Sequence, residues 1–89
     1  MKSRTAERFW KLFAKLPPDV QKQAYKAYEQ FSQNPYHPSL HFEQIDERDD
    51  LWSARVSEKY RVVGKRLKDE MRWFWIGTHN DYERFTGKS

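Results

Sequence analysis

Apolar residues recur at helical spacing over the first third of the chain. A first stripe follows Thr5, a residue suited to an N-cap, and the pair Pro17-Pro18 ends it. Pro18 and the acidic Asp19 are typical of the start of a second helix, which Asn34-Pro35 stops. The spacing therefore predicts a helical hairpin over about residues 5–34. Its two stripes consist of Phe9, Leu12, Phe13 and Leu16, and of Val20, Ala24, Ala27, Tyr28 and Phe31.

Beyond residue 39 the apolar pattern changes to period two, and strand-prone residues become frequent. Four strands are predicted, at residues 40–45, 51–57, 60–66 and 71–79, joined by short polar loops. Because short loops join antiparallel neighbours, we expect a meander over about residues 40–79, followed by a short turn or helix at 80–86. The helical hairpin on one face of this four-stranded sheet makes an α+β fold, expected as a single domain over residues 1–89.

Residues of equal parity share one face of a strand, which assigns side chains to the two faces of the sheet. The set Trp52, Ala54 and Val56 is expected to face the helices. In the last strand, Phe74, Ile76 and Thr78 are expected to oppose Trp73, Trp75, Gly77 and His79. The more polar faces then carry Arg55, Arg61, Lys65 and His79, which can form a basic cleft with one imidazole. The alternative is that these cations are only solvated and that the tryptophans form the core.

Charge is distributed unevenly along the 89 residues, whose net charge is +4. Residues 1–30 hold seven Lys/Arg against three Asp/Glu, and residues 51–89 hold nine against five. Residues 31–50 hold one against five, concentrated at 46–50. The basic segments fit attraction to a polyanion, although many small proteins are equally basic without such a partner. The acidic segment is either a solvated loop or a contact for a basic partner.

Several classes of function are excluded by composition. The chain has no cysteine, so disulfides, zinc thiolates and a Cys nucleophile are absent. His37 and His41 lie on either side of Pro38, off any helix, and the three glycines form no phosphate loop, so we expect no metal and no cofactor. The apolar stretches are too short for a membrane span or a signal peptide, and we expect a soluble, cytoplasmic protein without a membrane partner.

Three segments resemble motifs of the RelE/ParE toxin superfamily: Leu-Trp-Ser-Ala-Arg-Val at 51–56, Tyr-Arg-Val-Val-Gly at 60–64, and Trp-Phe-Trp-Ile-Gly-Thr-His-Asn-Asp-Tyr at 73–82. Residues 17–21 also resemble the junction between the two helices of that family. The likeness covers roughly residues 8–85. Because members have a helical hairpin before an antiparallel sheet and usually open with a short strand, the resemblance implies that residues 2–5 pair with the sheet edge.

The resemblance implies a toxin of a type II toxin–antitoxin system. Such toxins are most often ribosome-associated endoribonucleases that cleave mRNA and are held inactive by a cognate antitoxin protein. By position, the resemblance implies catalytic roles for Arg61, His79 and Tyr82. Because RNA carries its own nucleophile, the 2′-hydroxyl, an imidazole and a guanidinium suffice without a metal.

Further site residues are predicted around these three. Arg55, Lys65 and Trp75 are expected to contact RNA or its phosphates, and Glu43 is a candidate general base of the YoeB type. Two other functions stay open. One is a ParE-like inhibitor of DNA gyrase, which needs no imidazole, and the other is a catalytically inactive protein-interaction module.

Overall fold

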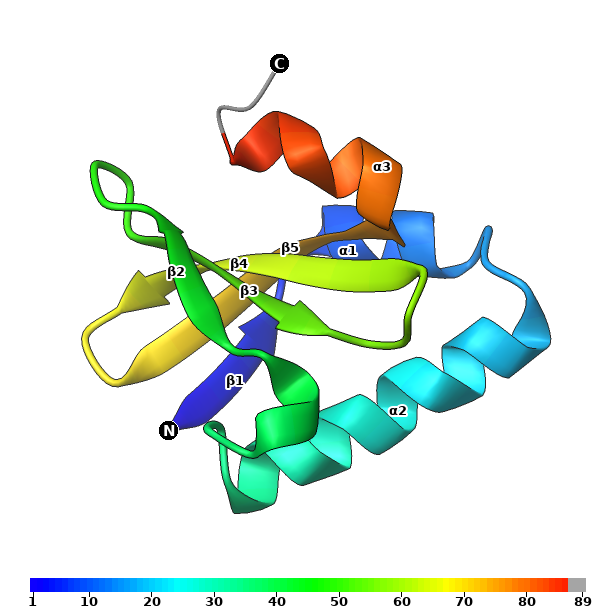
Figure 1. The fold of residues 1–89 in the computed structure, drawn as a ribbon, viewed down its shortest axis with the longest axis horizontal. Helices are drawn as coiled ribbons and strands as arrows, with labels where there is room; N and C mark the ends of the chain where they lie inside the picture. Colours follow the sequence, from blue (N-terminus) through cyan, green and yellow to red (C-terminus); the bar gives the residue numbers. More distant parts are fainter. Residues whose placement is uncertain (87–89) are drawn as a thin grey trace.

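The computed structural model describes residues 1–86, which form a five-stranded sheet with helices on both faces (Figure 1). The strand order is β1-β5-β4-β3-β2, in which β2 to β5 form the predicted antiparallel meander and β1 lies parallel to β5. The predicted α+β class is confirmed. The elements are β1 (Lys2–Thr5), α1 (Glu7–Phe13), α2 (Pro18–Gln33), a 3-10 turn (Pro38–Leu40), β2 (Glu43–Asp46), β3 (Leu51–Arg55), β4 (Tyr60–Leu67), β5 (Glu70–Thr78), α3 (His79–Tyr82) and a second 3-10 turn (Glu83–Phe85).

Strand β1 adds a fifth strand to the four that periodicity predicted, at the place that the family resemblance implied. Thr5 pairs with Trp73 in this strand, so the first helix begins later, at Glu7. The Thr5 hydroxyl accepts a hydrogen bond from the Trp10 indole at 2.7 Å instead of capping the helix. The predicted N-cap was therefore wrong, because pairing with β5 takes up the residue that local preference assigned to the cap.

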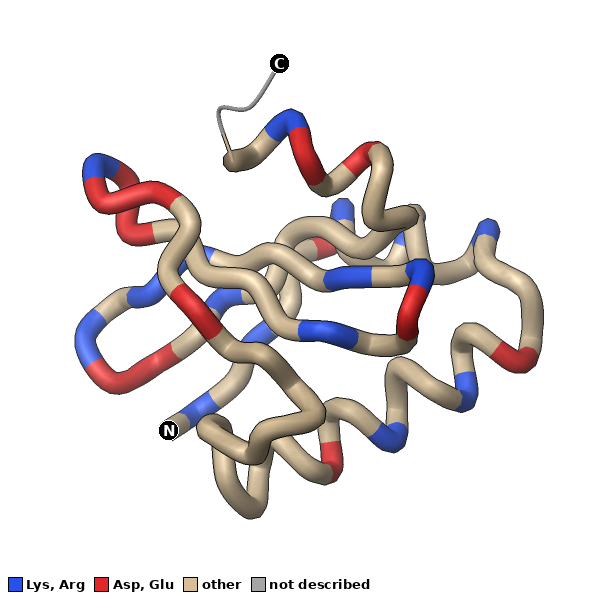
Figure 2. The backbone as a smooth tube through the Cα atoms, in the orientation of Figure 1, with Lys and Arg blue, Asp and Glu red and all other residues tan. Residues whose placement is uncertain are grey.

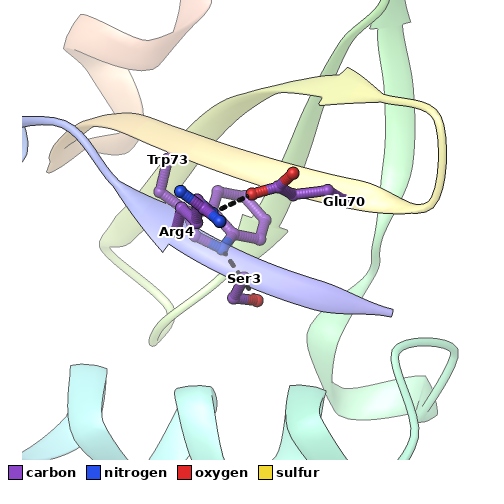
Figure 3. Close-up of polar contacts among 4 residues, drawn as sticks. All are labelled: Ser3, Arg4, Glu70 and Trp73. Carbon is purple, nitrogen blue, oxygen red and sulfur yellow. Dashed lines mark hydrogen bonds and ion pairs between the residues drawn. The ribbon is translucent and has the colours of Figure 1, made fainter.

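Side chains as well as backbone hold β1 against β5 (Figure 3). The Trp73 indole donates a hydrogen bond to the Ser3 hydroxyl at 3.4 Å, and Arg4 forms an ion pair with Glu70. An exposed ion pair contributes only ~0–1 kcal/mol. Since Trp73 is buried, its packing and the backbone ladder contribute more to the attachment of this edge strand.

Apolar side chains pack on both faces of the sheet, so α3 covers the face that was expected to stay partly open (Figure 1). The expectation that Trp52, Ala54 and Val56 face the helices α1 and α2 is confirmed. Tyr28, by contrast, is 53% exposed although the helical stripe included it. The larger core contains Phe9, Phe31, Leu40, Ala54, Met71, Trp73 and Ile76, and the smaller core, under α3, contains Val63, Trp75 and Tyr82.

A β-bulge at Phe74 changes the face assignment within β5. Gly64 pairs with Trp73 and the preceding Val63 pairs with Trp75, so Phe74 has no partner on β4. Because a bulge inserts one residue, it reverses the alternation of side chains beyond it. Trp73 lies in the larger core and Trp75 in the smaller one. The prediction that both rings share one face was therefore wrong.

Within residues 1–86, none of the helices combines the length and the apolar character that a membrane crossing requires.

Candidate functional site

Arg61, Ser53 and Tyr82 form a connected polar cluster where α3 packs on the sheet. The Arg61 Nη1 donates to Ser53 Oγ at 3.5 Å, and the Ser53 hydroxyl donates to the Tyr82 hydroxyl at 3.3 Å. The Arg61 guanidinium carbon lies 5.0 Å from the centroid of the Tyr82 ring, within cation–π range. Ser53 is fully buried and Tyr82 is 5% exposed. Buried groups from β3 and α3 therefore hold a guanidinium that comes from β4.

Strand register and a helix cap produce this arrangement. On β3, Ser53 pairs with Val63 and Arg55 pairs with Arg61. Because Ser53 is two residues from Arg55 on the same strand, its side chain lies on the same face of the sheet as those of Arg55 and Arg61. At the end of β5, the Thr78 hydroxyl accepts a hydrogen bond from the Asp81 backbone N–H at 3.2 Å and caps α3. The capped turn carries the chain over the sheet, and Tyr82 packs against this face.

His79 lies beside the cluster at its solvent edge. Its ring stacks on Tyr82 with centroids 5.5 Å apart and an interplanar angle of 25°. Its backbone N–H donates to the Lys59 carbonyl at 2.7 Å, and its side chain is exposed. The structure thus brings the three predicted catalytic residues, Arg61, His79 and Tyr82, together around the Tyr82 ring.

Arg61 carries a positive charge that no carboxylate neutralises within residues 1–86. The ion pairs in this part of the chain join Arg4 to Glu70 and Lys11 to Glu7. A guanidinium presents five N–H donors in a planar fork, and one of them contacts Ser53. The half-buried Arg61 therefore keeps donors for an anionic ligand such as a phosphate.

The other predicted cations lie at different distances from Arg61. Arg55 pairs directly with Arg61, and it is also one of the residues that line a groove with Lys26 of α2. Lys65 is exposed and pairs with Arg72. Because Lys65 is four residues along β4 from Arg61, their Cα atoms are roughly 13 Å apart. Arg55 is therefore adjacent to the cluster, whereas Lys65 lies outside it.

The candidate base Glu43 lies on β2, across from Ser53. The two residues pair in the sheet, and the Glu43 side chain is exposed. Residues that pair directly across antiparallel strands share a face. Glu43 therefore projects on the same face of the sheet as the cluster, one strand beyond Ser53.

The structure encloses two aromatic rings of the candidate site, that of Trp75, for which an RNA contact is predicted, and that of Tyr82. Trp75 is 3% exposed, lies 5.1 Å from the Phe85 ring, and has the Arg84 guanidinium 5.8 Å from its centroid. Tyr82 is similarly enclosed by Arg61 and by the sheet. A ring with so little exposed surface has no face available for a nucleobase. In this conformation Trp75 is a core residue, and Tyr82 contacts the predicted catalytic side chains rather than a base.

Ser53 is the site residue that sequence reasoning did not single out. Within residues 1–86 it is the one buried residue with a polar side chain apart from the aromatic Trp and Tyr rings. A signal was present in the sequence, since a hydroxyl at the centre of an apolar strand needs a hydrogen-bond partner when it is buried. Its parity, shared with Arg55, indicates on which face that partner lies.

Figure 2 shows acidic residues close together in the loop between β2 and β3, whereas the charged residues within β3 and β4 are Lys and Arg. In this loop the Asp50 carboxylate accepts hydrogen bonds from the Trp52 indole at 2.7 Å and from the Gln44 amide at 2.8 Å. These bonds hold the pKa of Asp50 below its ordinary value. At least one acid of the loop therefore has a structural role.

Residues 1–86 contain no group of three or more His, Asp or Glu side chains that could bind a metal ion.

Comparisons with known proteins agree with this fold. Residues 18–84 match the ParE-like toxin domain family, and the chain belongs to that family, which confirms the predicted RelE/ParE resemblance. A search of curated proteins gives no significant match.

Solved structures of toxins share the architecture at low sequence identity. A chain of the RelB–RelE antitoxin–toxin complex from Methanococcus jannaschii is 13% identical, with a TM-score of 0.73 over 92% of this chain and 96% of that one. The RelE–RelB complex from Pyrococcus horikoshii gives 13% identity and a TM-score of 0.69 over 99% and 97%. The YoeB/ParE toxin from Agrobacterium tumefaciens gives 13% identity and a TM-score of 0.66 over 89% of this chain and 99% of that one. These likenesses show the fold.

Proposed function

We propose that this protein is the toxin of a type II toxin–antitoxin system and that it cleaves ribosome-bound mRNA without a metal ion. One observation carries the proposal: the Tyr82 ring contacts both the guanidinium of Arg61, which has no carboxylate partner within residues 1–86, and the imidazole of His79. RNA cleavage by the 2′-hydroxyl needs a cation at the phosphate and groups that transfer protons, and a guanidinium and an imidazole are groups of these two kinds. Membership of a toxin family supports the biological class.

In the proposed reaction, the 2′-oxygen attacks the adjacent phosphorus and loses its proton. The bond from phosphorus to the 5′-oxygen breaks, and that oxygen takes up a proton. The products are a 2′,3′-cyclic phosphate and a 5′-hydroxyl end. Arg61 donates hydrogen bonds to the non-bridging phosphate oxygens, on which negative charge grows in the transition state.

The two proton transfers take place at the 2′-oxygen and at the 5′-oxygen, which lie on opposite sides of the phosphorus, so they call for two proton-transfer groups. His79, exposed beside the cluster, supplies one, and Glu43, exposed across from Ser53, is the candidate for the other. Arg55, which pairs with Arg61, is placed to contact a neighbouring phosphate, and Lys65 extends the cationic surface along β4.

The decisive experiment adds purified protein to translating ribosomes and maps cuts in the message by primer extension. Wild type should cleave, whereas Arg61→Ala and His79→Ala should be slower by roughly 10²–10³-fold, the usual effect of removing one such group. Arg48→Ala is the matched control, because Arg48 is exposed in the acidic loop away from the cluster. Folded Arg61→Ala and His79→Ala proteins that cut as fast as wild type would exclude the nuclease assignment.

Inhibition of DNA gyrase is a second candidate, which the match to the ParE-like family and the burial of Tyr82 favour. A protein that only binds gyrase needs no ring exposed for an RNA base. Purified gyrase, relaxed plasmid and this protein, mixed with ATP, separate the two candidates. Loss of supercoiling together with intact ribosome-bound message would replace the nuclease proposal by this one.

A cognate antitoxin is the proposed protein partner. Solved relatives of this fold include RelB–RelE antitoxin–toxin complexes. On this chain, an apolar groove of about 290 Å³ lies between β1, α1 and α2, with exposed Trp10, Tyr25 and Tyr28 along it. The segment up to residue 30 has an excess of basic side chains. We therefore expect the antitoxin to cover this groove with an apolar segment that also carries acidic residues.

The partner proposal predicts a salt-sensitive complex. Affinity for the cognate antitoxin should fall as ionic strength rises, since the rim charges are screened. Tyr25→Ala should weaken binding, whereas Tyr36→Ala should not, because Tyr36 is 60% exposed but lies outside the groove. An affinity that is unchanged between low and high salt would contradict the electrostatic part of this proposal.

A further inference from the structure

We infer that Ser53 is a positioning residue, which fixes the direction of the Arg61 guanidinium and so sets the rate of the chemical step. The inference rests on the proposed RNA cleavage and adds a residue to it. Ser53 itself cannot touch a substrate, because it is fully buried on the central part of β3. Its action has to pass through Arg61, to which it is hydrogen-bonded.

The Ser53 hydroxyl is fixed from both of its sides. It donates its one proton to the Tyr82 hydroxyl at 3.3 Å, which leaves its oxygen free to accept from Arg61 Nη1 at 3.5 Å. The backbone of Ser53 pairs with Glu43 on one side and Val63 on the other. Because strand and hydroxyl are both constrained, Ser53 presents an acceptor to Arg61 at a defined point.

Arg61 needs such a constraint because a neighbouring positive charge repels its guanidinium. Arg55 is its direct cross-strand partner, and like charges in that position repel each other. No carboxylate within residues 1–86 offsets this repulsion. The contacts that hold the guanidinium in place are the Ser53 hydroxyl and the Tyr82 ring, 5.0 Å from the guanidinium carbon. The contact with the Tyr82 ring does not prevent the Arg61 guanidinium from rotating within its own plane. The hydrogen bond to Ser53 Oγ fixes this rotation.

The two hydrogen bonds of the Ser53 hydroxyl are long, at 3.3 Å to Tyr82 and 3.5 Å to Arg61. Such bonds in catalytic sites often shorten only when substrate is bound. A phosphate on the outer donors of Arg61 therefore completes the arrangement that Ser53 prepares. Loss of the acceptor should reduce the rate of cleavage more than the affinity for RNA, because the charge of Arg61 stays in place while its direction is lost.

The first test measures single-turnover cleavage of ribosome-bound message. Ser53→Ala should lower the maximal rate about tenfold with less than a threefold change in the half-saturating concentration. Ser53→Cys keeps the size of the side chain but has only a weak acceptor, so it carries the test if the alanine variant does not fold. Ser32→Ala is the matched control, since Ser32 is exposed on α2 and its hydroxyl donates to the Glu29 carbonyl. A rate equal to that of wild type in a folded Ser53 variant would overturn the inference.

A double-mutant cycle separates positioning from a general structural effect. In an Arg61→Ala background, Ser53→Ala should cause no further loss of rate, because the side chain through which it acts is gone. If Ser53→Ala lowers the rate by the same factor with and without Arg61, its role is structural and the inference is wrong.

A readout that does not depend on activity distinguishes this inference from the proposed function. In ¹⁵N NMR of the arginine side chains, the Arg61 signals should show hindered rotation of the guanidinium in wild type and faster rotation in Ser53→Ala. If wild type leaves message uncut, the nuclease proposal fails while this comparison still decides the role of Ser53. Arg61 signals that are identical in the two proteins would overturn the positioning role.

Discussion

Arg61 on β4 lies against Tyr82 on α3, with its guanidinium carbon 5.0 Å from the centroid of the tyrosine ring. The contact links the position of a functional cation to the packing of the C-terminal helix. Because Tyr82 is buried and its hydroxyl also accepts from Ser53, the ring and the hydroxyl have separable roles.

Substitutions at Tyr82 should separate these two roles. Tyr82→Phe keeps the ring and removes the acceptor for Ser53, so it should lower the free energy of unfolding by only ~0.5–1.5 kcal/mol. Tyr82→Ala also empties the core under α3 and should cost ~3–5 kcal/mol, as for other large buried rings. Urea unfolding followed by tryptophan fluorescence measures both. Tyr36→Ala, at an exposed ring, is the control, and a Tyr82→Ala protein as stable as this control would contradict the described packing.

Trp75→Ala should destabilise the protein rather than only weaken RNA binding. The ring is 3% exposed and packs beneath Phe85, so its removal should cost ~3–5 kcal/mol. Trp10→Ala is the matched control, because the Trp10 ring is 43% exposed and its loss leaves no enclosed cavity. Thermal unfolding by circular dichroism compares the two variants. A Trp75→Ala protein that has the melting temperature of wild type but binds RNA poorly would restore the predicted role of this ring as an RNA contact.

Periodicity predicted the two N-terminal helices and the four strands of the meander, although the first of these strands begins at Glu43 and not at residue 40, which belongs to the 3-10 turn Pro38–Leu40. It missed β1 because Lys2–Thr5 has no apolar alternation, and only the family resemblance placed a strand there. It also assigned Trp73 and Trp75 to one face, since a bulge such as that at Phe74 leaves no mark in a hydrophobic pattern.

Part of the candidate site could also be predicted from the alternation of side chains along the strands. Parity placed Arg55 and Arg61 on one face, and their direct pairing follows from the β3–β4 register. The approach of Tyr82 to Arg61 depends on how α3 folds back over the sheet, which the sequence pattern does not encode. The role of Ser53 depends on that same approach.

Gly64→Ala should be costly because the bulge brings β5 close to this position. A Cβ at Gly64 would lie 2.7 Å from Cε3 of Trp73 and 2.9 Å from the carbonyl oxygen of Arg72. The carbonyl belongs to a paired strand and cannot move away without breaking the ladder, so we expect a loss of ~1–3 kcal/mol in the free energy of unfolding.

Lys65→Ala is the control for this variant, since Lys65 is the next residue on the same strand and is exposed. It should change stability by less than ~0.5 kcal/mol. Chemical denaturation of the two variants and wild type measures the difference. Gly64→Ala and Lys65→Ala proteins of equal stability would show that the bulged pairing of Gly64 with Trp73 is wrong.

Asp50 should make the stability of the protein sensitive to acid. The hydrogen bond from the Trp52 indole, then that from the Gln44 amide, lower the pKa of the Asp50 carboxyl from its ordinary value of 3.8. A carboxyl whose pKa is lower in the folded state contributes stability above its unfolded value, and this contribution is lost as pH falls through the folded value. The stabilisation by ionised Asp50 should therefore be full at neutral pH, begin to fall as pH approaches 3.8, and be lost as pH passes the lower pKa of the folded state.

Asp50→Asn isolates this charge, because asparagine has nearly the same shape and also tolerates the left-handed backbone of Asp50, whose φ is 52°. The difference in free energy of unfolding between wild type and Asp50→Asn should be constant at neutral pH and should shrink on acidification. Trp52→Phe removes the first hydrogen-bond donor, so an NMR titration of the carboxyl carbon should show the pKa of Asp50 rising toward 3.8. A stability difference that does not change down to acid pH, or an Asp50 pKa that does not respond to Trp52→Phe, would contradict the role of these bonds.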